Sequence, residues 1–221
     1  GPGVDSALLG RRCVAENVLA DGGEVGFEHP GGYGEFFLTD SGLIRILPDD
    51  FPLDEAALIE PLAVVARGMK RLKPGKGPAL VIGDGTIGLL AVMLLKREGV
   101  SEIAIVGGRA PRLELAREFG VSATVNYHDA KAGVALELER SFPRKIDSIV
   151  EAAKSDEALP LAFRLGAHAA KVLLIGNYGA KSSSIQLQDF LLNEFELIGS
   201  NASSGGWDKA LAIALSRELP L

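Results

Sequence analysis

Three glycines at positions 83, 85 and 88 have the spacing G-x-G-x-x-G, between an apolar run and a helical stretch. Such glycines have separate uses: Gly83 allows a tight turn, Gly85 lets backbone approach a pyrophosphate, and Gly88 lets helix and strand pack closely. The first N–H groups of the helix, at Thr86 and Ile87, would point at the phosphates, where the helix dipole favours negative charge. This setting predicts a bound dinucleotide. The alternative is a glycine-rich turn that serves packing alone.

The second expected strand, residues 102–106, ends without an acidic residue. In NAD-binding units a carboxylate about 20 residues beyond the glycines accepts hydrogen bonds from the adenosine ribose. Here Gly107 and Gly108 leave room for a 2′-phosphate, and the guanidinium of Arg109 suits phosphate oxygens. Arg112 lies one turn further along and could reach the same ribose. The sequence therefore predicts NADP(H), with NAD(H) as the alternative, and a plain turn with a solvated Arg109 as the second alternative.

Composition limits the function classes. The chain has 221 residues, 47% hydrophobic and 24% charged, which is ordinary for a globular protein. A formal net charge of −6 argues against a nucleic-acid partner. The longest apolar stretch, residues 87–95, is too short to span a membrane. With no signal-peptide pattern and a single cysteine, Cys13, we expect a cytoplasmic protein without a disulfide framework and without a membrane partner.

The first part of the chain differs in pattern from the rest. Residues 1–50 are rich in glycine and short apolar runs, and segments 34–38 and 42–48 are typical of short strands in a β-rich unit. Residues 54–72 have a mostly helical pattern, with Pro61 as the expected kink or break.

From residue 78 onward, expected strands and helices alternate. The expected strands cover residues 79–83, 102–106, 122–125, 147–150, 171–175 and 195–199. The expected helices cover residues 86–98, 110–119, 129–140, 156–165 and 206–217. Alternation of this kind is typical of an α/β fold, a doubly wound parallel sheet of the Rossmann type.

Several segments of the chain resemble the medium-chain, zinc-containing alcohol and polyol dehydrogenases. They are residues 10–18, 31–36, 55–64, 83–88, 112–120 and 150–152. The stretch Ile59-Glu60-Pro61-Leu62-Ala63 is similar to the sorbitol and threonine dehydrogenase branch. The resemblance implies that residues 1–53 end a β-rich GroES-like catalytic domain and that 54–77 form a connecting helix and loop. It implies further that 78–221 form a Rossmann dinucleotide-binding domain, incomplete at its C-terminus, so that the chain is a fragment.

The same resemblance implies the chemistry. Family members oxidise an alcohol bound to a catalytic zinc, and the alkoxide passes a hydride to the nicotinamide. Their first zinc ligands would lie upstream of this chain, whereas Glu60 corresponds to a later carboxylate held against the zinc or its bound water. Glu60 is thus the expected catalytic and metal residue; the alternative is a helix-start carboxylate. Ile175, Gly176 and Asn177 are expected to face the nicotinamide, and Ser200 and Asn201 to lie nearby.

The family's structural zinc is not expected here. Its four cysteines would fall at Gly1, Val4, Ala7 and Ala15, and Cys13 is out of register. One thiolate cannot build a closed tetrahedral site. We therefore expect one catalytic zinc in the full-length protein and no structural zinc.

Two alternative functions remain open, a zinc-free quinone or enoyl reductase of the same superfamily and a non-catalytic nucleotide-binding module. The expected partner is a small alcohol, polyol or sugar, and the resemblance implies a homodimer or homotetramer. The residues that would identify the substrate lie largely outside the chain. Asp84, between two motif glycines, is expected to point its side chain outward, away from a pyrophosphate.

Overall fold

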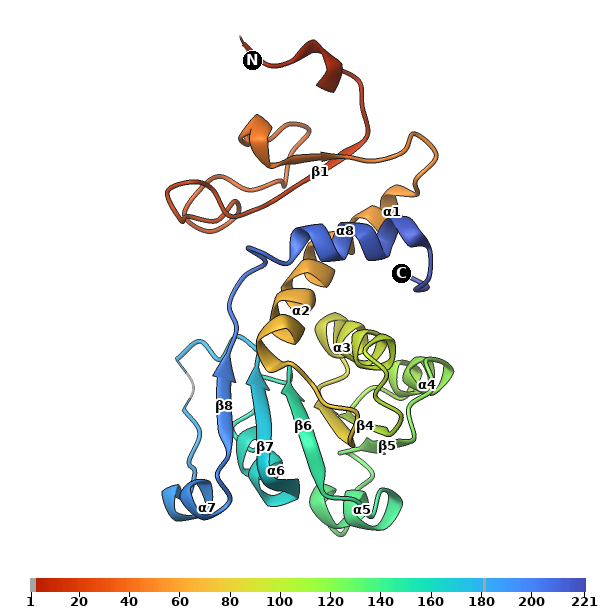
Figure 1. Ribbon diagram of the computed structural model, residues 1–221, viewed down its shortest axis with the longest axis vertical. Helices are drawn as coiled ribbons and strands as arrows, with labels where there is room; N and C mark the ends of the chain where they lie inside the picture. Colours follow the sequence, from red (N-terminus) through yellow and green to blue (C-terminus); the bar gives the residue numbers. More distant parts are fainter. Residues whose placement is uncertain (1–2, 181) are drawn as a thin grey trace. The chain divides into compact units, whose positions relative to one another are not determined.

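The computed structural model describes residues 3–180 and 182–221 (Figure 1). The chain divides into two compact units, unit 1 with Gly1–Arg67 and Ala202–Leu221, and unit 2 with Gly68–Asn201. We expected residues 78–221 to form one domain. Residues 202–221 instead group with the N-terminal residues, so unit 2 is inserted within the chain of unit 1.

Unit 2 contains a parallel six-stranded sheet in the order β5-β4-β3-β6-β7-β8 (Figure 1). The strands are β3 (Ala79–Ile82), β4 (Ile103–Gly107), β5 (Ala123–Asn126), β6 (Ile146–Glu151), β7 (Gly166–Leu174) and β8 (Glu196–Gly199). The expected doubly wound sheet is confirmed, with all six strands close to their expected positions. The chain order reverses between β3 and β6, and ligands of open α/β sheets bind at such a switch point, outside the carboxyl ends of the strands.

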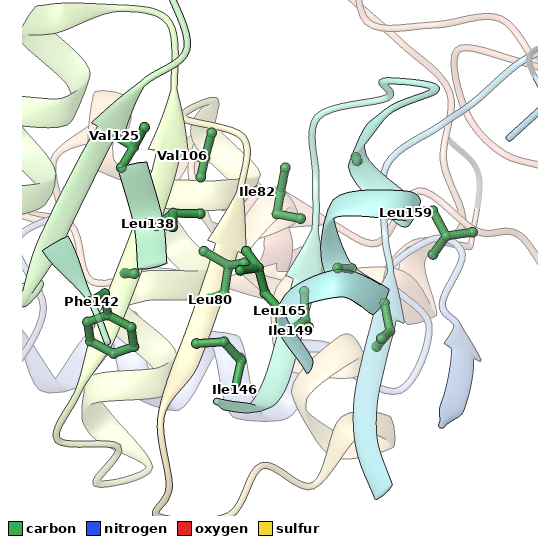
Figure 2. Close-up of a cluster of buried hydrophobic side chains, with 14 residues drawn as sticks. Leu80, Ile82, Val106, Val125, Leu138, Phe142, Ile146, Ile149, Leu159 and Leu165 are labelled. Carbon is green, nitrogen blue, oxygen red and sulfur yellow. The ribbon is translucent and has the colours of Figure 1, made fainter. Parts of the chain in front are cut away.

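Five helices accompany this sheet in the described part of unit 2. They are α3 (Thr86–Arg97), α4 (Ala110–Glu118), α5 (Val134–Ser141), α6 (Ala158–Leu165) and α7 (Leu187–Leu192). The first four were expected, whereas α7 was not. Leu80 and Ile82 of β3 share a buried cluster with Leu138 of α5 and Leu159 of α6, so α5 and α6 cover one face of the sheet (Figure 2).

Unit 1 contains little β-structure. Strand β1 (Cys13–Ala15) pairs antiparallel with β2 (Ile44–Ile46), and two short 3₁₀ turns cover Ser6–Leu8 and Ser41–Leu43. The strand expected at residues 34–38 is wrong. Within the described chain no strand pairs with this segment, and its side chains at Phe36 and Leu38 are exposed. Apolar residues favour a strand only where a partner strand and a core receive them.

The helical segment expected at residues 54–72 is broken at a different position from the expected one. Helix α1 (Leu53–Ala56) ends before α2 (Ile59–Leu72), and α8 (Trp207–Ser216) is the last helix. We expected a kink or break at Pro61, and this expectation is wrong. Pro61 lies in the first turn of α2, where the N–H that proline lacks would have no helical partner. No helix in the described residues is long and apolar enough to cross a membrane.

Candidate functional site

The glycine motif forms a tight turn between β3 and α3. Gly83 has φ +115°, and a Cβ there would lie 2.8 Å from the carbonyl carbon of Ala152. A Cβ on Gly88 would lie 2.9 Å from the carbonyl carbon of Gly83 and would meet its oxygen. Both distances are shorter than real Cβ contacts, so these two glycines are required by the packing of the protein itself.

Gly85 differs from its two neighbours in the motif. A Cβ built there meets nothing within 4 Å, and the residue has an ordinary φ of −75° as the N-cap of α3. In the described chain no side chain caps this helix by a hydrogen bond. The turn therefore leaves open space beside the N-terminus of α3, where Thr86 and Ile87 begin the helix. This space and the helix dipole fit a pyrophosphate.

Asp84 corrects the expectation of an outward-pointing side chain. It is only 8% exposed, and its Oδ2 accepts hydrogen bonds from the N–H of Gly108 at 3.1 Å and of Arg109 at 2.8 Å. A Cβ on Gly107 would lie 2.6 Å from the Asp84 Cγ. The carboxylate turns inward because two backbone N–H groups before α4, near the positive end of its dipole, are available to it.

A side chain also lies beside Gly108, the second glycine of the pair at the end of β4. A Cβ on Gly108 would lie 2.6 Å from Cε1 of Tyr127, so the tyrosine ring fills the space beside that residue. Arg109 is exposed, and Arg112 places Nη1 at 3.5 Å from the backbone oxygen of Asp84. The structure thus brings the two arginines and the glycine pair together. It adds the buried carboxylate of Asp84, which was expected to point outward from the glycine motif.

The residues expected near the nicotinamide lie at the carboxyl ends of β7 and β8, beside the end of β6. The N–H groups of Ile175 and Gly176 donate to the backbone oxygen of Glu151 at 3.0 and 3.1 Å. The Asn177 side chain accepts from the N–H of Gly179 at 3.0 Å. Ser200, which precedes Asn201, donates its N–H to Leu174 at 2.9 Å. These segments converge on the same edge of the sheet as the glycine motif.

Glu151 is a residue of this edge whose side chain the sequence did not single out. It is fully buried, and its Oε1 accepts from the N–H of Ala153 at 2.7 Å and of Lys154 at 2.9 Å. Burial, followed by the charge of Glu151, raises the pKa of Tyr178. The signal in the sequence was an acid directly after the apolar residues of β6.

Buried polar atoms gather at this edge, and one of them is unpaired. Ser200 Oγ is buried and has no hydrogen-bond partner among the described residues, whereas Glu151 Oε2 and the Tyr178 hydroxyl, also buried, interact with each other and so raise the pKa of Tyr178. Buried polar atoms are normally paired, and an unpaired one requires an explanation such as a bound group. The edge therefore fits a ligand with a polar head, as the nicotinamide amide has.

Glu60 lies in unit 1, at the start of α2. It is half-buried, and burial, then the charge of Glu24, raises its pKa, while a hydrogen bond with Ser203 opposes the rise. Ser203 Oγ accepts from Trp207 Nε1 at 3.0 Å and donates to Asn17 Oδ1 at 2.7 Å. The Glu60 carboxylate thus lies in a polar network. Because it is partly removed from water, its protonated form is favoured more than it would be in solution.

The residues present do not by themselves fit a zinc ion. Among the described residues no group of three or more His, Cys, Asp or Glu side chains could hold a metal. Val4, Ala7 and Ala15, the positions of the expected structural lobe, carry no ligand atoms, and Gly1 lies outside the described residues. Glu60 alone is not a metal site, and its role as a ligand stays a prediction.

Comparison with known proteins gives consistent matches. A family model described as zinc-binding dehydrogenase matches residues 86–216. The galactitol 1-phosphate 5-dehydrogenase of Escherichia coli K12 is 27% identical over 209 residues, covering 89% of this chain and 59% of that protein. The sorbitol dehydrogenase of Bombyx mori is 28% identical over 197 residues, covering 87% of this chain and 56% of that protein.

A solved structure matches the fold. The crystal structure described as a short chain alcohol dehydrogenase from E. coli CFT073, complexed with NADH, has a TM-score of 0.88 at 23% identity. The match covers 98% of this chain and 68% of that one. Against the two curated relatives, this chain spans only 59% and 56% of their length.

Proposed function

The chain belongs to the zinc-binding dehydrogenase family, and on this premise we propose that the longer protein transfers a hydride between a nicotinamide dinucleotide and an alcohol, polyol or sugar. The observation that carries the proposal is the open space at Gly85. Neighbouring glycines are required by packing, whereas the absence of a side chain at Gly85 serves nothing in the protein itself. A ligand that approaches the backbone there explains it.

The chain's own residues divide the work of binding. Gly83 and Gly88 shape the turn, Gly85 admits the pyrophosphate, and the N-terminus of α3 stabilises its charge. Ile175, Gly176 and Asn177, with Ser200 and Asn201, are proposed to position the nicotinamide at the carboxyl edge of β7 and β8. The unpaired hydroxyl of Ser200 supports a polar group bound there.

The zinc is the second part of the proposal. When bound, it would supply Lewis-acid polarisation of the alcohol oxygen. Glu60 is proposed to accept or hold a proton beside that centre, and its raised pKa brings proton exchange closer to neutral pH. The first metal ligands are expected outside this chain. A metal-free reductase and a non-catalytic nucleotide-binding module are the alternatives that the experiments below separate.

The full-length protein is expected to contain about one zinc per subunit, rather than two, because the positions of the structural lobe lack cysteine. Elemental analysis after dialysis measures this. Two tightly held zinc ions would contradict the missing lobe, and no zinc at all would favour the metal-free reductase.

The NADP(H) preference expected from Gly107, Arg109 and Arg112 stays a prediction, and the buried carboxylate of Asp84 weighs against it. The homodimer or homotetramer and the cytoplasmic location also stay predictions. A small alcohol, polyol or sugar is the proposed substrate because the curated relatives are named for galactitol 1-phosphate and sorbitol.

Replacing Gly85 with alanine tests the dinucleotide site. The new Cβ meets nothing in the protein within 4 Å and the φ of −75° suits any residue. We therefore expect an unchanged melting temperature and an NADH affinity lower by roughly ten-fold, about 1.4 kcal/mol of binding free energy. Titration followed by cofactor fluorescence measures the affinity.

Gly75→Ala is the matched control, because its Cβ would meet only the backbone nitrogen of Gly77 at 3.9 Å, in a loop before β3. It should bind NADH as the unaltered protein does. If Gly85→Ala also bound NADH normally, the open space would not be a pyrophosphate site. A protein that binds neither NADH nor NADPH would reject the proposed function.

A further inference from the structure

We propose that Asp84 sets the cofactor preference: its carboxylate, reaching across from the β3 turn, takes the place of the ribose-binding acid that β4 lacks and makes the protein select NAD(H) over NADP(H). The inference rests on the proposed dinucleotide site. It names a residue within that site and reverses the preference that the sequence of the β4 turn alone predicts.

The register of the sheet brings Asp84 to this place. Strands β3 and β4 are parallel neighbours, and Ile82 is paired with Val106. Two residues beyond that pair, Asp84 lies beside Gly108, at the end of β4. Its Cγ lies 2.6 Å from the position that a Cβ of Gly107 would occupy. An acid from the neighbouring turn thus fills the space where a side chain of residue 107 would begin.

The glycines of the β4 turn therefore have a different explanation from the one the sequence suggested. Gly107 is required because Asp84 occupies its side-chain space, and a side chain at Gly108 would displace the end of the Tyr127 side chain. The side-chain position of Gly107 meets a carboxylate, and that of Gly108 meets an aromatic ring. The two glycines therefore have an explanation within the protein and are not evidence of room for a 2′-phosphate.

The hydrogen bonds point the same way. Both backbone N–H groups of the turn, at Gly108 and Arg109, already donate to Asp84 Oδ2. A 2′-phosphate would have to displace the carboxylate from these donors or lie against it as a like charge in a nearly buried place. The ribose hydroxyls of NAD(H), in contrast, can donate to the remaining oxygen, Oδ1, as they do to a strand-end acid.

Arg109 and Arg112 do not offset the unfavourable effect of Asp84 on a 2′-phosphate. Arg109 is exposed, and an exposed charge pair is worth little because water screens it. Arg112 Nη1 faces the backbone oxygen of Asp84, on the side of the glycine motif, which suits the pyrophosphate shared by both cofactors. The buried carboxylate therefore decides between the cofactors, and the arginines contribute to binding either one.

The test is a titration of the full-length protein with NADH and with NADPH, followed by fluorescence. We expect NADH to bind at least about ten-fold more tightly, the factor that 1.4 kcal/mol gives. Asp84→Asn keeps the size and an acceptor for the N–H groups but removes the charge. It should raise NADPH affinity by roughly ten-fold and change NADH affinity by less than about three-fold.

Two further variants keep the result interpretable. Asp147→Asn removes an exposed carboxylate at the start of β6, at the opposite edge of the same sheet, and should leave the ratio of affinities unchanged. Arg109→Ala should also leave the ratio unchanged within about three-fold, about 0.65 kcal/mol. If Asp84→Asn lowers the melting temperature, the inference is still tested by the Arg109→Ala variant and by the ratio of NADH to NADPH affinity in the unaltered protein.

Tighter binding of NADPH than of NADH, equal binding of both, or an unchanged ratio in Asp84→Asn would overturn the inference while leaving the dinucleotide site intact. A loss of NADPH affinity in Arg109→Ala without an equal loss of NADH affinity would overturn it too, because it would restore the arginine as the determinant. Failure to bind either cofactor would instead reject the proposed function.

Discussion

Replacing Gly88 with alanine is expected to destabilise unit 2 by about 3 kcal/mol, at the upper end of the cost of inserting one carbon into packed structure. The new Cβ would meet the carbonyl group of Gly83, whose carbon lies at 2.9 Å, and backbone cannot rotate aside as a long side chain can. Helix α3 would have to move away from β3. Urea unfolding followed by far-ultraviolet circular dichroism measures the loss.

Gly85→Ala is the control for this prediction, because it adds the same methyl group three residues earlier, where nothing lies within 4 Å. The two variants should separate stability from binding, with Gly88→Ala losing stability and Gly85→Ala losing cofactor affinity. Equal stability of Gly88→Ala and the unaltered protein would mean that the close approach of helix and strand is not required.

Glu60→Gln is expected to lower turnover of the full-length protein at least ten-fold, and about a hundred-fold if the carboxylate transfers the proton itself. The amide keeps the shape of the side chain but cannot accept a proton. Steady-state rates with a panel of polyols, sugars and short alcohols measure the effect. NADH affinity serves as the control, because Glu60 lies in unit 1 and the proposed dinucleotide residues lie in unit 2.

The raised pKa of Glu60 predicts a second measurable effect of Glu60→Gln, on the pH dependence of the rate. Burial disfavours the ionised carboxylate in the folded state, so its contribution to stability is complete below the usual value of 4.5 and is lost as pH rises through the folded pKa. The acid limb of the rate profile should accordingly lie above pH 4.5 and disappear in Glu60→Gln. Unchanged turnover and zinc content would leave Glu60 as a helix-start residue.

The sequence predicted the strands of unit 2 well because buried parallel strands are continuous apolar runs. Residues 103–106, for example, are buried without interruption, and charged or glycine residues bound them. Helix α7 was missed because it has six residues and its leucines at 187, 191 and 192 are exposed, so no buried stripe marks it. The strand expected at 34–38 was predicted from apolar residues, but it does not form because these residues have no partner strand in the described chain.

The glycine motif was predictable, whereas the direction of Asp84 was not. Spacing along one segment shows which residues share a turn. It does not show that the side chain of a residue in a neighbouring turn, here Asp84, lies where a side chain of Gly107 would begin. The sequence itself contains both the acid at 84 and the glycines at 107 and 108. Only the parallel register of β3 and β4 makes these positions adjacent.

The hydrogen bond between Ser203 and Asn17 joins residues 186 positions apart in the sequence. Because unit 2 lies between them in the chain, unit 1 cannot complete this contact until both ends of the inserted unit are available. Closing so long a loop in an unfolded chain carries a large entropy cost, and prior folding of unit 2 fixes part of that loop in advance. From this connectivity we expect the inserted unit to fold first and the polar network around Trp207 to form last.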